Sequence, residues 1–251
     1  MADLITNISQ AIADFGTIKQ AIIDKNVDVP DGTPTSRYGE LIENIQTGEN
    51  LSELLPKSIG LTHFFDYQNG VDITNKTWTD RVSGVVCTAD GDFNVSENCL
   101  EMDGKAFSLG YGEGLSAHTI YAIVCAKEYI SGWMSFIAAY GDTPQFNLCN
   151  YSGKLAIGAG DASGIYNKGT IPAYDEWHVC CITADEGFGA FYIDGIMKYS
   201  YNGYAKPQYT NQLPLYFGYG NIKMMAVCPN VAHSEKIVAE NSEYLKSKYI
   251  E

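Results

Sequence analysis

The sequence is short of basic residues. Its 251 residues include 16 lysines and arginines against 30 aspartates and glutamates, the formal net charge is -14, and the arginines are Arg37 and Arg81. A protein that reads nucleic acid needs a basic face to neutralise phosphates, and an anionic membrane surface attracts basic segments. We therefore expect no nucleic-acid partner and no electrostatic attachment to a membrane.

Long apolar runs are also missing. The run TIYAIVCA, residues 119–126, has the length of a strand, whereas a helix needs about 20 apolar residues to cross a bilayer. The first ten residues, MADLITNISQ, contain no basic region followed by an apolar stretch. We therefore expect neither membrane insertion nor a signal peptide.

Motifs for metals, cofactors and common catalytic machinery are absent from the sequence. The seven cysteines form no C-x-x-C pair, which favours reduced, buried thiols in a protein made in a cytoplasm. There is no G-x-S-x-G, no phosphate-binding loop and no Rossmann glycine pattern. No histidine has a second ligand at metal spacing; the four are His63, His118, His178 and His233. These absences predict no metal, no cofactor and no catalytic residues.

Residues 1–50 follow a helical period. A narrow apolar stripe with alternating spacings of four and three is made by Leu4, Ile8, Ala11, Phe15, Ile18 and Ile22. Such a stripe is typical of a helix that packs along a partner. It can dock on the rest of the chain or on copies of itself, as a parallel trimer or dimer. We favour self-association as a homotrimer, with residues 1–50 as a helical stem for oligomerisation or anchoring.

From about residue 59 the period changes to two. Short runs of β-branched and aromatic residues alternate with Gly, Asn and Asp, and no helical pattern intervenes before the end of the chain. This pattern predicts a mainly β fold, an antiparallel two-sheet sandwich, for residues 51–251. The chain closes with a helix capped by Ser234, whose predicted apolar face is Ile237, Val238, Tyr244 and Leu245.

Residues 175–197, DEWHVCCITADEGFGAFYIDGIM, predict a three-stranded meander. The segment from Trp177 to residue 184 is nearly all apolar, which is typical of a central strand covered on both faces. The dipeptide Asp194-Gly195 tolerates the positive φ of a two-residue hairpin turn. Trp177 is then expected in the core, and His178 is expected to be packed or hydrogen-bonded rather than to act as a base.

Several short patterns occur in a fixed order along this region. They are W-x-D-x-x-S-G from Trp78, L-x-x-D-G from Leu100, E-W-H-V from Glu176, Y-I-D-G from Tyr192 and a last helix after His233-Ser234. Their order resembles the laminin-G-like, concanavalin A-like jelly roll over about residues 59–251. That family implies a two-sheet sandwich, and it includes lectins, carbohydrate-binding modules, adhesion domains and some glycoside hydrolases. The resemblance therefore does not fix the function.

The N-terminal region has a second resemblance. Residues 18–45, IKQAIIDKNVDVPDGTPTSRYGELIENI, resemble a short unit of bacteriophage structural proteins, especially fibres. The sequence departs from that unit at Asn26, where glycine is usual, but asparagine also tolerates the left-handed conformation that ends a helix. The resemblance implies a virion protein made in the cytoplasm of a bacterial host, with other virion proteins as partners.

Two further sites that the jelly-roll resemblance suggests find little support. Hydrolases on this fold that resemble the laminarinases carry E-x-D-x-x-E on one strand, whereas the nearest stretch here, from Glu101, has Ala106 in place of the last carboxylate. Asp103-Gly104 within it is expected to be a turn. Laminin-G-like domains often bind calcium through acidic loops, but the spacing of Asp90, Asp92, Asp142 and Asp161 matches no calcium loop.

Tyrosines concentrate in residues 198–221, KYSYNGYAKPQYTNQLPLYFGYGN. Sugars stack their C–H faces on flat aromatic rings while side-chain amides meet their hydroxyls, and tyrosine also suits protein contacts. The predicted ligand-binding residues are Tyr201, Asn202, Tyr204 and Tyr209.

The favoured function is a non-enzymatic phage fibre or receptor-binding protein. Its stem assembles or anchors the protein, and its lectin-like head adheres to a surface glycan or protein, with repetition of heads multiplying a weak affinity. One alternative is a capsid decoration or head fibre protein with a purely structural role. The other is a carbohydrate-binding module or a glycoside hydrolase.

Overall fold

The chain divides into two compact units, Met1–Leu54 and Leu55–Glu251. The computed structural model describes residues 15, 19, 34, 51–96, 98–109, 117–126, 133–139, 146–151, 154–161, 164–172, 175–185, 187–204 and 215–251. Within these residues every strand belongs to the second unit, and the first unit contributes the short helix α3 (Leu51–Leu54).

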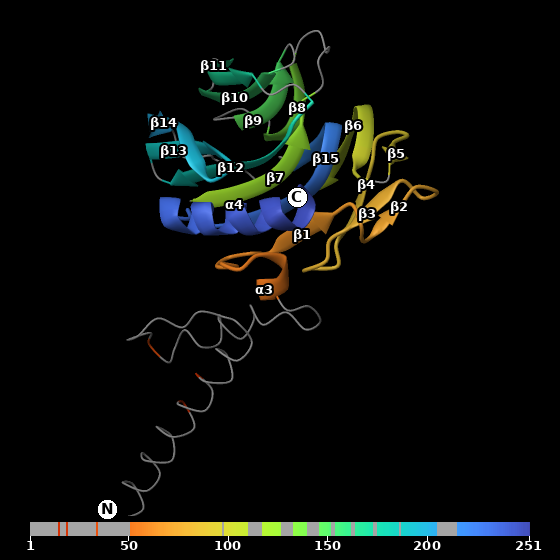
Figure 1. The fold of residues 1–251 in the computed structure, drawn as a ribbon, viewed down its shortest axis with the longest axis horizontal. Helices are drawn as coiled ribbons and strands as arrows, with labels where there is room; N and C mark the ends of the chain where they lie inside the picture. Colours follow the sequence, from red (N-terminus) through yellow and green to blue (C-terminus); the bar gives the residue numbers. More distant parts are fainter. Residues whose placement is uncertain are drawn as a thin grey trace, which may run out of the picture. The chain divides into compact units, whose positions relative to one another are not determined.

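The second unit is built from antiparallel strands and ends in a helix (Figure 1). The elements are β1 (His63–Asp66), β2 (Val71–Asp72), β3 (Thr77–Thr79), β4 (Val86–Thr88), β5 (Asn94–Val95), β6 (Leu100–Leu109), β7 (His118–Cys125), β8 (Trp133–Ala139), β9 (Phe146–Tyr151), β10 (Lys154–Asp161), β11 (Gly164–Pro172), β12 (Trp177–Asp185), β13 (Gly187–Ile193), β14 (Ile196–Tyr204), β15 (Leu215–Pro229) and α4 (Glu235–Tyr249).

The long strand β15 is hydrogen-bonded in both layers of the fold. Its first part, residues 215–222, pairs with β6, and residues 215–217 also pair with β8. Its second part, residues 221–229, pairs with β7, and residues 224–227 also pair with β1. One layer therefore runs β14-β13-β12-β7-β15-β1, and the other runs β11-β10-β9-β8-β15-β6-β5.

A single hydrophobic core fills the space between the two layers. It includes Ile120 and Ile182 from the first layer and Phe136, Leu148 and Leu155 from the second. A small separate sheet, β2-β3-β4, adds Trp78 to this core. The architecture confirms the predicted antiparallel sandwich with a C-terminal helix, because alternating apolar residues on both layers face each other.

Aromatic rings pack together where β15 begins. Phe217 of β15 lies 4.9 Å from Phe65 and 5.5 Å from Phe107 between ring centroids, and the Trp78 ring lies 5.5 Å from Phe65. Trp78 is completely buried, and its indole N–H donates to the Asp66 carbonyl (3.0 Å). The N–H group of the buried indole thus has a hydrogen-bond partner, as is usual for a buried tryptophan.

The register of β15 shifts where it passes between the layers. The shifts fall between Gly218 and Gly220 in the pairing with β6, and between Ile222 and Met224 in the pairing with β7. Gly220 has φ +119°, and a Cβ there would lie 2.7 Å from a Phe136 ring carbon. Only glycine allows this backbone conformation and this close approach of the ring.

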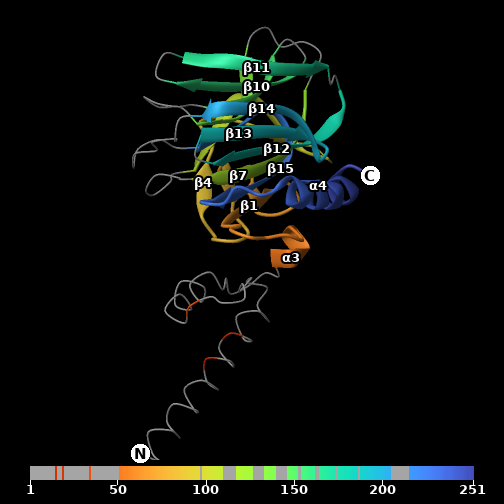
Figure 2. The same cartoon turned by 90° about the vertical axis from the view of Figure 1, so that its left-hand side faces the viewer.

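The outer face of the first layer is covered by α4. Figure 1 shows the helix lying along β12, β7 and β15 on the side away from β8–β11, and Figure 2 shows the same layering from a second direction. All eight residues of β7 are buried, as are residues 179–184 of β12. The predicted central strand covered on both faces is confirmed. No helix in the described part of the chain is long and apolar enough to cross a membrane.

Polar side chains beneath α4 hold the helix to the segment that enters the second unit. Asn241 accepts a hydrogen bond from the Lys57 N–H (2.9 Å) and donates to the Lys57 carbonyl (3.1 Å) and to the Tyr121 hydroxyl (3.2 Å). The same hydroxyl lies 2.8 Å from His233 Nδ1, and His233 Nε2 donates to the Ile59 carbonyl (2.8 Å). Each buried polar group in this network has a partner, so it rigidifies the packing rather than weakening it.

Three local predictions need correction. Asp103-Gly104 is not a turn, because both residues lie inside β6. They fall at the register shift between β6 and β15. Trp177 is only partly buried rather than a core residue. The buried face of α4 differs from the predicted one, because Ile237 and Tyr244 are only partly buried while the helix buries Val238, Asn241, Ser242, Leu245 and Tyr249.

The meander and the cysteines follow the prediction. β12 pairs with β13 and β13 with β14, and the turn residues Asp194 and Gly195 have φ +50° and +77°. All seven cysteines are buried thiols. Burial raises the pKa of Cys87 and Cys149 to about 12, so these thiols are poor nucleophiles at neutral pH.

The buried histidine at the start of β7 makes folding stability depend on pH. Burial lowers the pKa of His118 from 6.5 to about 4. Between these values the unfolded chain binds a proton that the folded chain does not, so stability is complete above pH 6.5 and falls as pH decreases through this window. The shift corresponds to a loss on the order of 3 kcal/mol. Urea unfolding across the window should show this slope.

The matched variant is His118→Gln, which removes the titrating group from the same buried position. Its stability should fall less between pH 6.5 and about 4. A smaller slope should remain, because burial also lowers the pKa of His233. An equal slope in the variant and the natural chain would show that His118 does not titrate as described.

Candidate functional site

The pattern W-x-D-x-x-S-G runs from Trp78 in β3 into the loop that leads to β4. Its aspartate, Asp80, is 1% exposed and accepts hydrogen bonds from the Phe64 N–H (2.7 Å) and the Val82 N–H (3.0 Å). Asp80 also accepts from the Ser83 hydroxyl, and its Oδ2 lies 2.6 Å from His63 Nδ1. Burial raises the pKa of Asp80, but these hydrogen bonds outweigh it and hold the pKa below its ordinary value. Asp80 therefore fastens the loop to β1.

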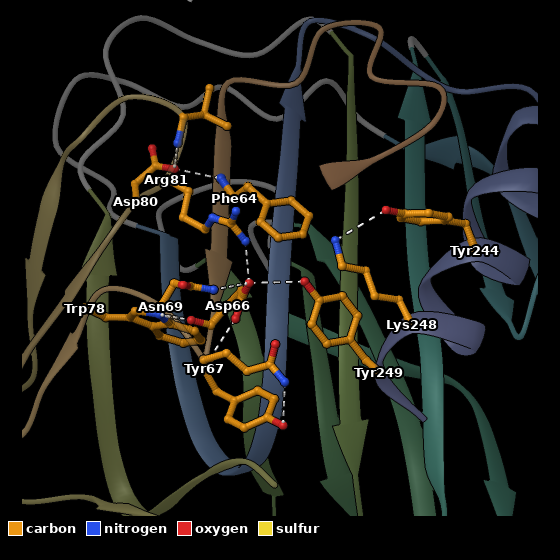
Figure 3. Close-up of polar contacts among 12 residues, drawn as sticks. Phe64, Asp66, Tyr67, Asn69, Trp78, Asp80, Arg81, Tyr244, Lys248 and Tyr249 are labelled. Atoms are coloured by element: carbon orange, nitrogen blue, oxygen red, sulfur yellow. Dashed lines mark hydrogen bonds and ion pairs between the residues drawn. The ribbon is translucent and has the colours of Figure 1, made fainter. Parts of the chain in front are cut away.

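A second buried carboxylate, Asp66, stands at the end of β1 (Figure 3). Its Oδ2 accepts from Arg81 Nη1 (2.6 Å), Asn69 Nδ2 (3.0 Å) and the Tyr249 hydroxyl (3.2 Å). Its Oδ1 accepts from the Gln68 N–H (2.7 Å). These donors come from the β1–β2 turn, the β3–β4 loop and the last residue of α4. Asp66 thus joins three segments that are far apart in the sequence.

The C-terminal end of α4 is held by a buried lysine. Lys223 is 6% exposed, and its ammonium donates to the Tyr249 carbonyl (2.7 Å) and lies 4.5 Å from the centre of the Trp177 ring. The positive charge suits the negative end of the helix dipole and the face of the indole. Burial lowers the pKa of Lys223. Lys223 is the residue at the register shift between β15 and β7. Its ammonium group reaches the C-terminal end of α4 from this irregular position.

The patterns E-W-H-V and Y-I-D-G meet at the β13–β14 turn. Asp194 Oδ1 accepts from the Val179 N–H (3.0 Å), and Asp194 Oδ2 lies 2.8 Å from His178 Nδ1. His178 Nε2 lies 3.6 Å from a Glu176 oxygen. Burial raises the pKa of Asp194, but its bonds to His178 and Val179 outweigh it and hold the pKa low. The expectation that His178 is hydrogen-bonded is confirmed.

These carboxylates and histidines hold loops and turns in place. The described residues contain no group of three or more His, Cys, Asp or Glu that could hold a metal. Glu101, from the hydrolase-like stretch, is exposed and pairs with Asn221 and Asn94 in the sheet. Among the acidic residues considered for calcium, Asp92 pairs with Lys76 (2.8 Å), Asp161 ends β10, Asp90 is exposed, and Asp142 lies outside the described residues.

The predicted ligand residues are placed on β14 and beyond it. Tyr201 pairs with Gly189 of β13, Asn202 with Phe188, and Tyr204 with Gly187. Asn202 is exposed, and Tyr209 lies outside the described residues. β14 ends the order of strands in its layer, so this part of the chain lies at the margin of the sandwich.

An exposed aromatic residue lies directly across from Asn202. Phe188 is 39% exposed. The core contains Phe191 and Ile193 of β13, so the alternate residues Phe188 and Ala190 belong to the outer face of the layer. Phe188 and its cross-strand partner Asn202 therefore share that outer face. An aromatic ring beside an amide is the combination that was predicted among the tyrosines of residues 198–221.

Phe188 was not among the predicted ligand residues, although the sequence carried a signal for it. Phe188 stands between Gly187 and Gly189 in the segment EGFGAF. Glycines on both sides carry no side chains that could cover the ring. A glycine-rich segment is typical of a turn, and only the strand register shows that the ring lies beside Asn202.

The predicted oligomerisation residues are mostly outside the described part of the chain. Leu4, Ile8, Ala11, Ile18 and Ile22 are all among the residues not described. Phe15 is helical and 42% exposed. The stem and its self-association remain predictions.

No protein-family model matches the sequence, and no curated protein matches it. Solved structures do match. Domain 4 of AbnA, a GH43 extracellular arabinanase from Geobacillus stearothermophilus in complex with arabinotriose, has a TM-score of 0.58 and 15% identity over 72% of this chain and 98% of that one. Because the identity is so low, this likeness establishes the fold alone.

Two other matches belong to larger proteins. The botulinum neurotoxin serotype D ligand binding domain in complex with N-acetylneuraminic acid has a TM-score of 0.52 and 13% identity, covering 74% of this chain and 52% of that one. A Trypanosoma rangeli sialidase has a TM-score of 0.53 and 14% identity, covering 73% and 33%. This chain thus spans about half of the toxin domain and a third of the sialidase. These three likenesses agree on the β-sandwich fold of this chain and show no more than that.

The Asp66 network should behave as structural support. Arg81→Met leaves a buried carboxylate without its charged partner and should lower the free energy of unfolding by about 3 kcal/mol. Asp66→Asn in the same chain should make the Arg81→Met loss smaller, because the uncompensated charge is gone. Urea unfolding of the single and double variants measures both effects.

The control is Lys248→Met, which removes an exposed cation from α4. It should change stability by no more than about 0.5 kcal/mol. If Arg81→Met were as mild as this control, the ion pair with Asp66 would not support the fold.

Proposed function

We propose that this chain is a non-enzymatic glycan-binding adhesion protein of a virion fibre. The sandwich is the binding head, and the predicted N-terminal helical stem gathers several heads. The observation that carries the proposal is the exposed pair of Phe188 and Asn202 on the outer face of the β12-β13-β14 meander.

This pair has the chemistry that saccharides require. A flat ring accepts the C–H face of a sugar, and an amide both donates to and accepts from hydroxyls. Phe188 and Asn202 stand on paired strands rather than on loops, so their spacing is fixed by the sheet. The ring stays exposed although the chain buries most of its other large apolar side chains in the described region.

The structural neighbours support a saccharide as the ligand class. One neighbouring sandwich is in complex with arabinotriose and another with N-acetylneuraminic acid. A single exposed ring supports only weak binding. Several heads on one stem would raise the apparent affinity by linking the binding events, and the resemblance of residues 18–45 to a phage fibre unit supports such a stem.

The partners of the buried carboxylates favour adhesion over hydrolysis. A glycoside hydrolase needs two carboxyl groups facing one sugar linkage. Asp66, Asp80 and Asp194 are committed to Arg81, His63 and His178, and they hold loops and turns. We therefore rank a hydrolase below a binding protein, and a purely structural capsid decoration is the outcome if no glycan binds.

Removing the ring tests the proposal directly. Phe188→Ala should weaken glycan binding about tenfold or more, because stacking contributes about 1 kcal/mol beyond the buried area. A glycan array with the intact chain identifies ligands, and calorimetry on the best ligand gives the change in Kd. The variant should keep its thermal stability, since Phe188 is exposed.

The matched control is Ile196→Ala. Ile196 is 60% exposed and lies on the neighbouring strand β14, so the change removes exposed apolar surface away from Asn202. Its glycan binding should be unaffected. A natural chain that binds no glycan, or a Phe188→Ala variant that binds as well as the natural chain, would refute the proposed site.

The stem gives a separate prediction. Ile8→Asp with Ile22→Asp places two charges in the predicted seam, which disfavours helix association. Sedimentation of the natural chain should give three times 27.5 kDa, and the double variant should sediment as a single chain. Gln10→Asp, outside the seam, should leave the trimer intact. A natural chain that is monomeric would contradict the stem.

A further inference from the structure

The exposed pair belongs to a longer row of side chains. Asp185 of β12 pairs with Phe188 of β13, and Phe188 pairs with Asn202 of β14. All three side chains are exposed. The row runs across three neighbouring strands, and because strands lie about 4.8 Å apart it spans about 10 Å. That length exceeds a single sugar ring and suits a short oligosaccharide.

The adjacent row on the same face carries no charge. It consists of Thr183, Ala190 and Ser200, paired across the same three strands. Thr183 and Ala190 are buried, whereas Ser200 is exposed. Among the six residues of these two rows, Asp185 is the one with an ionisable acidic side chain. Farther along the meander, Tyr192 of β13 is buried, whereas Lys198 of β14 is exposed.

Each member of the row offers a different contact. The carboxylate of Asp185 accepts hydrogen bonds from adjacent hydroxyls and donates none. The Phe188 ring offers an apolar face. The Asn202 amide both donates and accepts. A ligand that satisfies all three needs hydroxyls at one end, a C–H face in the middle and mixed polar groups at the other end.

A ligand with its own negative charge does not fit this row. A carboxylate or sulfate beside Asp185 would place two like charges close together, which costs free energy even in water. The net charge of -14 on the whole chain adds a long-range repulsion of anions. N-acetylneuraminic acid, which the botulinum domain holds, is therefore a poor ligand for this site.

We infer that the row Asp185–Phe188–Asn202 binds an uncharged oligosaccharide laid across β12, β13 and β14. A sugar ring stacks on Phe188, its hydroxyls donate to Asp185, and the next sugar residue meets Asn202. This inference rests on the proposed glycan-binding function and adds the ligand class and its direction across the strands.

The test uses the intact chain and paired glycans. Calorimetry compares a neutral oligosaccharide with the same oligosaccharide capped by N-acetylneuraminic acid on the sugar that contacts the protein. The neutral ligand should bind at least tenfold more tightly. Asp185→Asn should weaken neutral binding about tenfold, because hydrogen bonds to charged groups contribute more than neutral ones, and it should reduce the discrimination against the acidic ligand.

A second variant tests the direction of the ligand. Asn202→Ala should weaken binding of the oligosaccharide and leave binding of the monosaccharide that stacks on Phe188 unchanged. The control is Ser200→Ala, in the adjacent row on the same strand, which should leave both unchanged. Asp185, Asn202 and Ser200 are exposed, so thermal melting should show that each variant folds.

The outcomes separate this inference from the proposed function. If Phe188→Ala abolishes binding while Asp185→Asn has no effect, or if the acidic glycan binds more tightly, the site stands but the uncharged ligand class is wrong. If neither the neutral nor the acidic glycan binds, both proposals fail together. If Asn202→Ala weakens the monosaccharide and the oligosaccharide equally, the ligand does not lie across the strands.

Discussion

The sharing of β15 by both layers is the constraint on which the rest of this fold depends. One strand supplies hydrogen bonds to β6 and β8 in its first part and to β7 and β1 in its second. An irregularity in its hydrogen-bond ladder lets a strand bend, and Gly220 and Lys223 stand at the two irregularities of β15. The glycine admits the Phe136 ring, and the lysine anchors the end of α4.

The buried carboxylates, which are the residue type that an active site would use, hold this architecture together. Asp80 joins the β3–β4 loop to β1, and Asp66 joins the same region to α4. Asp194 ties the β13–β14 turn to the start of β12. In a large sandwich, long loops and a covering helix would otherwise be held by few contacts, so buried ion pairs specify their positions. The proposed binding residues lie apart from these networks, at the exposed end of the meander.

The candidate site shows how far residue patterns could lead. Asn202 was predicted from the tyrosine-rich composition around it, and the meander that carries it was predicted from the Asp194-Gly195 turn. Phe188 and Asp185 were missed, because their nearness to Asn202 depends on the register between three strands. Register is set by the sum of many cross-strand contacts, and none of these contacts is visible within a single segment.

The sequence by itself determined the period of two, the hairpin turn, the doubly buried run in β12, and the final helix, because each follows from the local order of apolar, polar and turn residues. Only the tertiary structure decided that β15 serves both layers, that Asp103-Gly104 lies within a strand, and that α4 buries Asn241 rather than Tyr244. Those outcomes depend on contacts between segments far apart in the chain, where packing overrides local preference.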